Sequence, residues 1–427
     1  MMMEEAIEKL PKVELHAHLN GCIRESTLFD LAKERSVTLS HEHFHHQDHQ
    51  VPSNSSILDH DDPPAARFFN VRPRSLQDCF DIFAEIPKCV DDLISLRRIT
   101  LEALEDFAKH NVVYLELRST PKQLHVQSAN KTGNYGAEQK KPRLASKKDY
   151  CHVILQAMED FEKDQNQLNL KQEEQRKIAN ESNAPSSQQG PIPTMTCRFL
   201  VAVDRSHSNE TAMEHIELAK DLVQSDEYGY RVVGVDIGGN PTKNHFHDFR
   251  PAFEVAREAG LKITLHCAEV PCHDNDDDPS NKRVVIAYDE AKSILEFAPD
   301  RLGHALLLPP SLQSMLQKSK IPVECCPTSN VMTLELAKDF HGSLLDGMKQ
   351  HPQLPLWLES NHPVSINTDD PGVFDTDPTK EWRLVQETYG LSLERIQQVL
   401  LESMDQAFCD TATKDRIKTQ MKLAFDS

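Results

Sequence analysis

The chain has 427 residues, which is enough for one large barrel domain or for about two or three ordinary domains. Its 47 Lys and Arg residues against 67 Asp and Glu residues give a formal net charge of −20, which opposes nonspecific binding to nucleic acid or to an anionic membrane surface. A small-molecule substrate suits this composition better, and we expect a monomer without nucleic-acid or membrane partners.

The cysteines and the N-terminal residues indicate the compartment. The ten cysteines show neither a Cys-x-x-Cys spacing nor a small disulfide framework, which favours a reducing environment. Residues 1–10 are charged and acidic and lack the basic and apolar regions of a signal peptide, and no run of about 18 apolar residues occurs. We therefore expect a cytosolic (cytoplasmic) protein.

Short runs rich in β-branched residues recur along the chain, and most of them alternate with segments of helical periodicity. This alternation is the pattern of parallel βα units. Eight such units fit an α/β fold, the closed (β/α)8 TIM barrel, whose chemistry lies at the C-terminal ends of the strands. We expect a single domain over residues 1–427, closed by extra helices after residue 370. The predicted strands cover residues 13–19, 112–118, 197–204, 232–237, 261–266, 302–305, 321–325 and 364–367.

Two polar stretches interrupt this pattern and are predicted to be surface insertions. Residues 37–71 are rich in histidine, residues 164–195 are poor in core-forming residues, and we expect loop or disorder in the second. The acidic run after residue 271 is expected to be another loop. The histidine-rich stretch could bind a metal adventitiously, although a mobile polar insertion without chemistry is the favoured interpretation. Its histidines are His41, His43, His45, His46, His49 and His60.

The first predicted strand carries two candidate metal ligands. In VELHAHL, residues 13–19, His16 and His18 are two positions apart, so both side chains point to the same side of a strand. Two imidazoles at that spacing can bind one ion. Taken alone, the pair could equally be two core or surface side chains.

Three further strand ends carry candidate ligands or acid–base groups. His266 ends the fifth strand, and Glu269 follows it as a carboxylate that could move protons between water and a substrate. His304 ends the sixth strand, and Asp369 and Asp370 follow the eighth. Each feature also has a structural interpretation. The glutamate could begin a helix, a lone histidine is often structural, and adjacent aspartates are typical of turns.

The combination of these features favours a metal site. In a closed barrel, the first, fifth, sixth and eighth strands present these residues at the same end. Three histidines and one carboxylate suit Zn²⁺ and leave a position for water. Two adjacent carboxylates point in different directions, so one can bind the metal while the other contacts the substrate.

Five motifs give the chain a family resemblance. The sequence resembles the adenosine and AMP deaminases of the metal-dependent amidohydrolase superfamily through ELHAHLNG, LHCAEVP, RLGHA, CPTSN and NTDDPGVF, which in this order span nearly the whole chain. The resemblance implies a zinc-dependent hydrolase of purine nucleotide metabolism and salvage that deaminates C6 of a purine, with one Zn²⁺ per chain. The metal ligands that it implies are His16, His18, His266 and Asp369.

The same resemblance implies the catalytic groups. Glu269 would donate a proton to the purine ring and assist attack at C6. His304 would orient the metal-bound water and help to deprotonate it, and Asp370 would also steer that water or hold the purine. The backbone of Gly239, in DIGGNP, would approach the purine, which suits a residue without a Cβ atom. The chemistry agrees, because Zn²⁺ lowers the pKa of bound water and a carboxylic acid at the ring nitrogen neutralises developing charge.

Within the family, HLNG, YLELRSTPK, LVAVDR and DIGGNP resemble the adenosine deaminase-like branch, whose members convert N6-methyl-AMP to IMP and an amine. Hydroxyl groups and a lysine after the second strand can bind a phosphate, so we expect a 5′-monophosphate to be required. One departure is Ile86-Pro87-Lys88, where this branch usually carries a histidine. The substrate contacts implied by the branch are His18, Asn20, Ser119, Thr120, Pro121, Lys122, Asp204, Gly239 and Asp370.

Two other functions remain open on the sequence. One is the conversion of adenosine to inosine and ammonia. The other, of a different class, is a catalytically silent purine-binding relative. Glu269, His304 and Asp370 are all present, which argues against a silent relative because a binding protein does not need all three groups.

Overall fold

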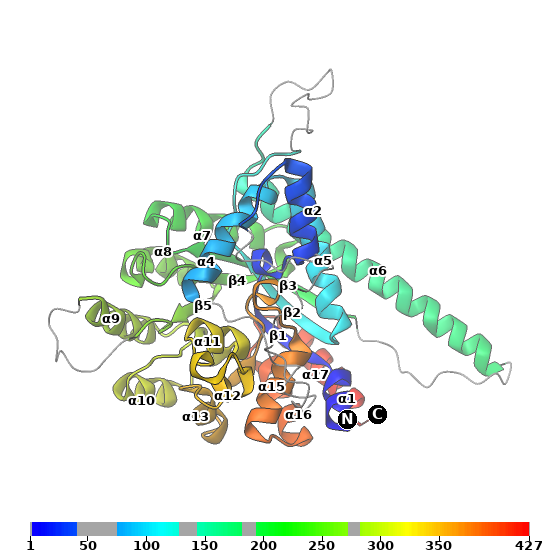
Figure 1. Ribbon diagram of the computed structural model, residues 1–427. Coiled ribbons are helices and arrows are strands. Elements are labelled where there is room, and N and C mark those ends of the chain that lie inside the picture. Colours follow the sequence, from blue (N-terminus) through cyan, green and yellow to red (C-terminus); the bar gives the residue numbers. More distant parts are fainter. Residues whose placement is uncertain (1, 41–74, 128–142, 182–193, 272–281, 427) are drawn as a thin grey trace, which may run out of the picture.

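Eight parallel strands form the centre of the computed structural model, which describes residues 2–40, 75–127, 143–181, 194–271 and 282–426 (Figure 1). The strands lie in sequence order, and each pairs in parallel with the next. The predicted barrel is therefore confirmed, and the predicted strands differ from the observed ones only at their ends. The strands are β1 (Lys12–His18), β2 (Val112–Ser119), β3 (Thr196–Asp204), β4 (Val232–Gly238), β5 (Lys262–Cys267), β6 (Arg301–His304), β7 (Val323–Cys325) and β8 (Val364–Ile366).

Residues that follow β8 close the barrel against β1. The His18 N–H donates to the Asp369 carbonyl at 3.0 Å, and the Asp369 N–H donates to the His16 carbonyl at 2.9 Å. The Leu15 N–H donates to the Asn367 side-chain oxygen at 2.9 Å. The closure therefore brings the predicted ligands at the two ends of the chain side by side, because the same residues make the closing backbone hydrogen bonds.

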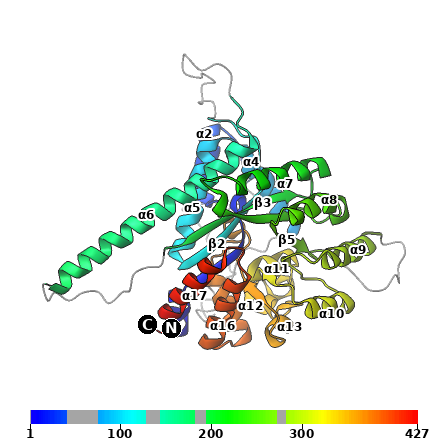
Figure 2. The same ribbon diagram turned by 180° about the vertical axis from the view of Figure 1, so that it is seen from behind.

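Helices surround the barrel, and both termini lie close together (Figures 1 and 2). Their buried residues recur at helical spacing, as in α7, where Ala212, Ile216, Ala219 and Leu222 face the sheet side. The predicted closing helices are confirmed as α15 and α16. The helices are α1 (Met2–Lys9), α2 (Glu25–Arg35), α4 (Leu76–Cys89), α5 (Leu93–Lys109), α6 (Lys147–Glu181), α7 (Asn209–Val223), α8 (Phe246–Glu258), α9 (Lys282–Phe297), α10 (Pro310–Ser319), α11 (Pro327–Thr333), α12 (Leu344–Met348), α13 (Leu354–Glu359), α14 (Pro371–Phe374), α15 (Pro378–Tyr389), α16 (Leu393–Gln406) and α17 (Thr411–Phe425).

The prediction of loop or disorder over residues 164–195 is wrong for residues 164–181, which continue helix α6 away from the barrel (Figures 1 and 2). The stretch is polar, but Gln, Lys, Glu, Leu and Arg are good helix formers, and neither Gly nor Pro occurs in the helix. Lys163 and Glu159 add an ion pair of 2.7 Å at i, i+4 spacing. Residues 182–193 of this insertion lie outside the described residues, as do residues 41–74, with the histidine-rich stretch, and the acidic run 272–281.

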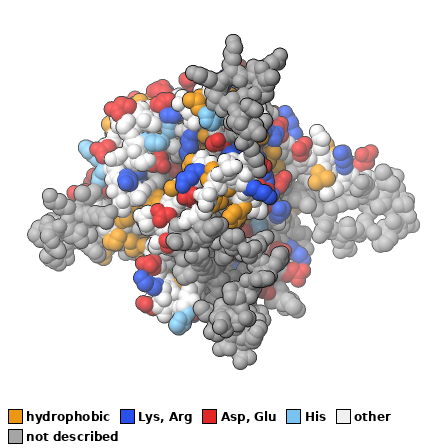
Figure 3. All heavy atoms as spheres, turned by 45° about the horizontal axis from the view of Figure 1, so that its top comes forward, with side chains coloured by type: hydrophobic (Ala, Val, Ile, Leu, Met, Phe, Trp, Pro, Cys, Tyr) orange, Lys and Arg blue, Asp and Glu red, His pale blue; other side chains and the backbone are white. Residues whose placement is uncertain are grey.

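The described surface carries charge of both signs. Figure 3 shows acidic and basic side chains interspersed with small hydrophobic areas on the face turned to the viewer. Among the described residues, no helix combines the length and the apolar character needed to cross a membrane.

The barrel interior contains fully buried ion pairs. Arg301 pairs with Glu116 on β2 and, at 2.6 Å, with Glu324 on β7. Glu116 also accepts hydrogen bonds from the Tyr114 hydroxyl at 2.8 Å and from the Phe408 N–H at 2.6 Å. The two carboxylates and the guanidinium are all fully buried. Buried charges require such partners, because an unpaired charge in the interior is costly.

Removal of the Glu116 charge should therefore destabilise the barrel. We expect Glu116→Gln to lower the free energy of unfolding by about 3–5 kcal/mol, the typical cost of breaking a buried ion pair. The midpoint of urea unfolding, followed by circular dichroism, measures this change. Glu217→Gln on the exposed side of α7 is the matched control, since Glu217 is half exposed and pairs with Lys220 on the surface of its own helix. Equal midpoints for the two variants would contradict the expectation.

Candidate active site

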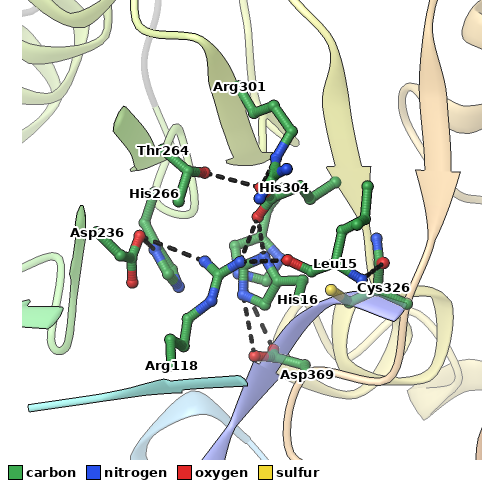
Figure 4. Close-up of polar contacts among 12 residues, drawn as sticks. Leu15, His16, Arg118, Asp236, Thr264, His266, Arg301, His304, Cys326 and Asp369 are labelled. Carbon is green, nitrogen blue, oxygen red and sulfur yellow. Dashed lines mark hydrogen bonds and ion pairs between the residues drawn. The ribbon is translucent and has the colours of Figure 1, made fainter. Parts of the chain in front are cut away.

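Four side chains converge at the C-terminal end of the barrel, and Figure 4 labels three of them, His16, His266 and Asp369. His16 and His18 come from β1, His266 comes from β5, and Asp369 follows β8. His18 Nε2 lies 3.2 Å from His16 Nε2 and 3.2 Å from His266 Nε2. Asp369 Oδ1 lies 3.3 Å from His16 Nε2 and 3.4 Å from His18 Nε2. The structure therefore brings together all four residues that the resemblance implies as metal ligands.

The spacing of these atoms fits a metal ion. Ligand bonds of about 2.0–2.1 Å in a tetrahedral site place neighbouring ligand atoms roughly 3.3–3.4 Å apart. The observed separations of 3.2–3.4 Å agree with this value. Lone pairs that point at one centre repel one another, and a cation at that centre offsets the repulsion.

Partners outside this group orient the ligands. His16 Nδ1 lies 2.6 Å from Glu324 Oε2, and His266 Nδ1 lies 3.1 Å from Asp236 Oδ1. The Ser329 hydroxyl donates to Asp369 Oδ2 at 2.7 Å. Each carboxylate accepts a hydrogen bond from the Nδ1–H of its histidine, so the Nε2 lone pair faces the centre.

The sequence interpretation missed these partners. Glu324 and Asp236 are single acidic residues within apolar strands, IPVEC and VVGVDIG, and a buried carboxylate in such a strand was the available signal. Ser329 lies in the CPTSN motif, which was recognised without a role for the serine.

The three predicted acid–base groups surround the candidate metal site. His304 Nε2 lies 3.7 Å from Glu269 Oε1 and 3.9 Å from Asp369 Oδ2. Burial raises the pKa of Glu269 above its usual range, and burial together with the negative charge of Asp369 raises the pKa of Asp370. Burial also lowers the pKa of His304 to about 3. A carboxyl group with a raised pKa suits a proton donor near neutral pH.

Unusual backbone geometry holds these side chains in place. His304 and Asp369 have φ angles of 61° and 63°, in the left-handed region that non-glycine residues rarely adopt. Such conformations cost about 1–3 kcal/mol each and are concentrated at functional sites.

At Gly21, a Cβ atom would lie 1.7 Å from Asp370 Oδ1, so any other residue would displace the Asp370 carboxylate. This contact explains the glycine of the HLNG motif.

A cavity of about 570 Å³ opens next to these groups, a size typical of small-ligand sites. Helix α4 forms an apolar wall with Leu76, Phe80, Phe83 and Pro87, so the position at which the branch usually has a histidine is apolar here. Neither His16, which is fully buried, nor Pro121 is among the residues that line the cavity. The predicted residues that line it are His18, Asn20, Ser119, Thr120, Lys122, Asp204, Gly239, His266, Glu269, His304, Asp369 and Asp370.

Two lysines line the same cavity. Lys122 follows β2 and is half buried, and burial lowers its pKa against the opposing effect of the Asp204 charge. Lys243, in the segment between β4 and α8, is exposed and was not predicted from the sequence. Gly239 has a φ of 88°, and a Cβ atom there would lie 2.9 Å from Asp204 Oδ1. The glycine therefore lets the backbone pass close to Asp204 beside the cavity.

Comparison with known proteins agrees with this geometry. The adenosine deaminase family model matches residues 11–423. The N6-mAMP deaminase of Arabidopsis thaliana is 32% identical over 99% of this chain and 98% of that protein, and the N6-methyl-AMP deaminase of Danio rerio is 30% identical over 96% and 94%. The crystal structure of Arabidopsis ADAL complexed with IMP has a TM-score of 0.67 at 30% identity and covers 99% and 98% of the two chains. The chain therefore belongs to the adenosine deaminase family, as its motifs predicted, and is a hydrolytic deaminase.

Proposed function

We propose that this chain hydrolyses N6-methyl-AMP to IMP and methylamine. The observation that carries the proposal is its similarity over nearly the full length to proteins named N6-methyl-AMP deaminase, together with the structure of one such protein with IMP, the product of this reaction. A related Arabidopsis structure contains GMP, another 5′-monophosphate. Thr120, Lys122 and Lys243 line the cavity and could bind such a phosphate.

One Zn²⁺ per chain is the proposed cofactor. Three imidazoles and one carboxylate at tetrahedral spacing suit zinc better than Mg²⁺ or Ca²⁺, which prefer oxygen ligands. When bound, the ion supplies Lewis-acid activation of water at neutral pH. His16, His18, His266 and Asp369 would hold it.

The remaining residues move protons and orient the purine. Glu269 donates a proton to N1 of the ring as water adds to C6, which neutralises the charge that develops on the ring. The charge of a bound cation would keep Asp370 ionised despite its burial. Asp370 takes one proton of the water and passes it to the amine nitrogen as the C6–N bond breaks and methylamine leaves. The C6 hydroxyl gives its proton to Glu269 and becomes the carbonyl of IMP. The Gly239 backbone approaches the ring from β4, and the apolar side chains of α4 exclude water from the cavity.

The proposed unit is a monomer in the cytosol. The proposed ligands and the cavity residues form a complete site within one chain, so the proposed reaction requires no second copy. No disulfide joins the described cysteines, which supports a reducing compartment.

Side-by-side kinetics with four substrates test the proposed function. We expect the highest kcat/KM with N6-methyl-AMP, a lower value with AMP, and little turnover of adenosine or N6-methyladenosine, because the nucleosides lack the phosphate. The ultraviolet absorbance change of the purine reports each reaction. Preferred turnover of adenosine would instead support the conversion of adenosine to inosine, and no turnover of any of the four would support a silent relative.

Lys122→Ala should raise KM for the nucleotide and leave any nucleoside activity unchanged, because the proposed partner of the lysine charge is the phosphate, which nucleosides lack. Lost charge-assisted contacts typically cost about 1.5–3 kcal/mol, or roughly 10- to 150-fold in KM. Steady-state kinetics on both substrate classes measure the change, with Lys220→Ala on the outside of α7 as the control. An equal rise in KM for nucleotide and nucleoside would contradict the role of Lys122 in phosphate binding.

Glu269→Gln should keep the metal and lose nearly all turnover, because glutamine cannot donate the proton to the ring. Loss of a general acid typically costs about 10²- to 10⁴-fold in rate. Metal analysis by mass spectrometry and kcat measurements on the same preparation separate the two effects. Glu254→Gln on α8 is the matched control, since Glu254 pairs with Arg250 on the outer surface. A near-normal kcat for Glu269→Gln would refute the proton-donor role.

A further inference from the structure

A buried chain of hydrogen bonds runs from the segment before α13 to the candidate metal site. It joins His351, Asn330 and His304, which are 4%, 1% and 3% exposed. His351 Nε2 lies 3.2 Å from Asn330 Oδ1, and Asn330 Nδ2 lies 3.1 Å from His304 Nδ1. The chain therefore reaches the side of His304 that faces away from the metal ligands.

At the His351 end of this hydrogen-bond chain, backbone N–H groups determine which atoms donate and which accept. The N–H groups of Gln353 and Leu354 donate to His351 Nδ1 at 3.3 and 3.0 Å. A backbone N–H can only donate, so Nδ1 accepts and the ring proton of neutral His351 lies on Nε2. His351 therefore donates to the oxygen of Asn330.

A second backbone group fixes the amide of Asn330. The Cys326 N–H donates to Asn330 Oδ1 at 3.3 Å. Rotation of the amide by half a turn would place its NH₂ group against this N–H and against the His351 proton, which would oppose donors to donors. The NH₂ group therefore faces His304 Nδ1, and this nitrogen must accept.

We propose that Asn330, supported by His351, is a positioning residue that holds His304 as the tautomer with its proton on Nε2. This nitrogen is the one that faces Glu269 Oε1 and Asp369 Oδ2, at 3.7 and 3.9 Å. His304 then enters the reaction as a hydrogen-bond donor to the attacking water and does not remove its proton. The assignment follows from hydrogen-bond geometry and replaces the role in deprotonation that the family resemblance implied. It rests on hydrolytic deamination but not on the choice of N6-methyl-AMP.

The tautomer can be observed without an activity assay. In zinc-loaded protein labelled with ¹⁵N-histidine, a long-range ¹H–¹⁵N correlation spectrum distinguishes protonated from unprotonated ring nitrogens. The signals of His304 are those that His304→Gln removes from the spectrum. We expect a protonated Nε2 and an unprotonated Nδ1. A protonated Nδ1 with an unprotonated Nε2 would overturn the proposal whether or not the substrate assignment holds.

Asn330→Asp tests the consequence for catalysis. A carboxylate of the same shape still accepts from Cys326 and His351, but it draws the His304 proton to Nδ1. Neutral His304 then loses its Nε2 donor, and only the doubly protonated ring keeps it. We expect kcat to fall at least about tenfold at alkaline pH, as for the loss of one transition-state donor, and to recover toward acid pH, with KM little changed.

A catalytic base at His304 predicts the opposite pH dependence. An aspartate at position 330 would strengthen such a base, so kcat would hold or rise toward alkaline pH, and that result would overturn the proposal. Glu269, Asp369, His16 and His266 also face the His304 ring, and the variant leaves all four in place. Asn111→Asp before β2 is the matched change of amide to carboxylate at a surface position, where the side-chain amide donates to the Lys9 carbonyl at 3.0 Å, and should keep the parent profile. If Asn330→Asp does not fold, the spectrum of the unmodified protein decides.

Discussion

The rest of the barrel interior depends on the hydrogen bonds that the Glu324 carboxylate accepts. It accepts hydrogen bonds from Arg301 and Thr264 on one oxygen, at 2.6 and 2.8 Å, and from Arg118 and His16 on the other, at 2.8 and 2.6 Å. Burial opposes ionisation, but the two guanidinium groups hold the pKa of Glu324 well below its usual range. The ionised carboxylate therefore serves the fold, through the arginines, and the site, through the orientation of His16.

Arg118 extends this dependence across the barrel. It donates to the Leu15 carbonyl at 2.6 Å and lies 3.3 Å from Asp236, which in turn meets His266 (Figure 4). His16 on β1 and His266 on β5 are thus oriented by two carboxylates, Glu324 and Asp236, that share the buried cation of Arg118. Because the Asp369 backbone also closes the barrel, the candidate metal site and the final strand contact form together. We infer that the site is rigid for the same reason that the barrel is closed.

The sequence predicted the parts of this arrangement that repeat along the chain or form local motifs. Strand and helix periodicity predicted the barrel, and His-x-His predicted two imidazoles on one side of β1. The partners Glu324 and Asp236 were not predicted, because each contacts a residue on another strand and such pairing has no local pattern. The tautomer of His304 depends in the same way on two backbone N–H groups that only the fold places beside His351. The polarity of residues 164–181 predicts loop or disorder, but their high helix propensity prevails, and they form the second half of α6.

The position of the metal is the most direct test of this account. Crystals of the protein purified without added metal can be measured at the zinc absorption edge, where anomalous scattering locates zinc. We expect one strong peak per chain between the Nε2 atoms of His16, His18 and His266 and Oδ1 of Asp369. No zinc peak at that place, or a peak only in the histidine-rich insertion, would contradict it.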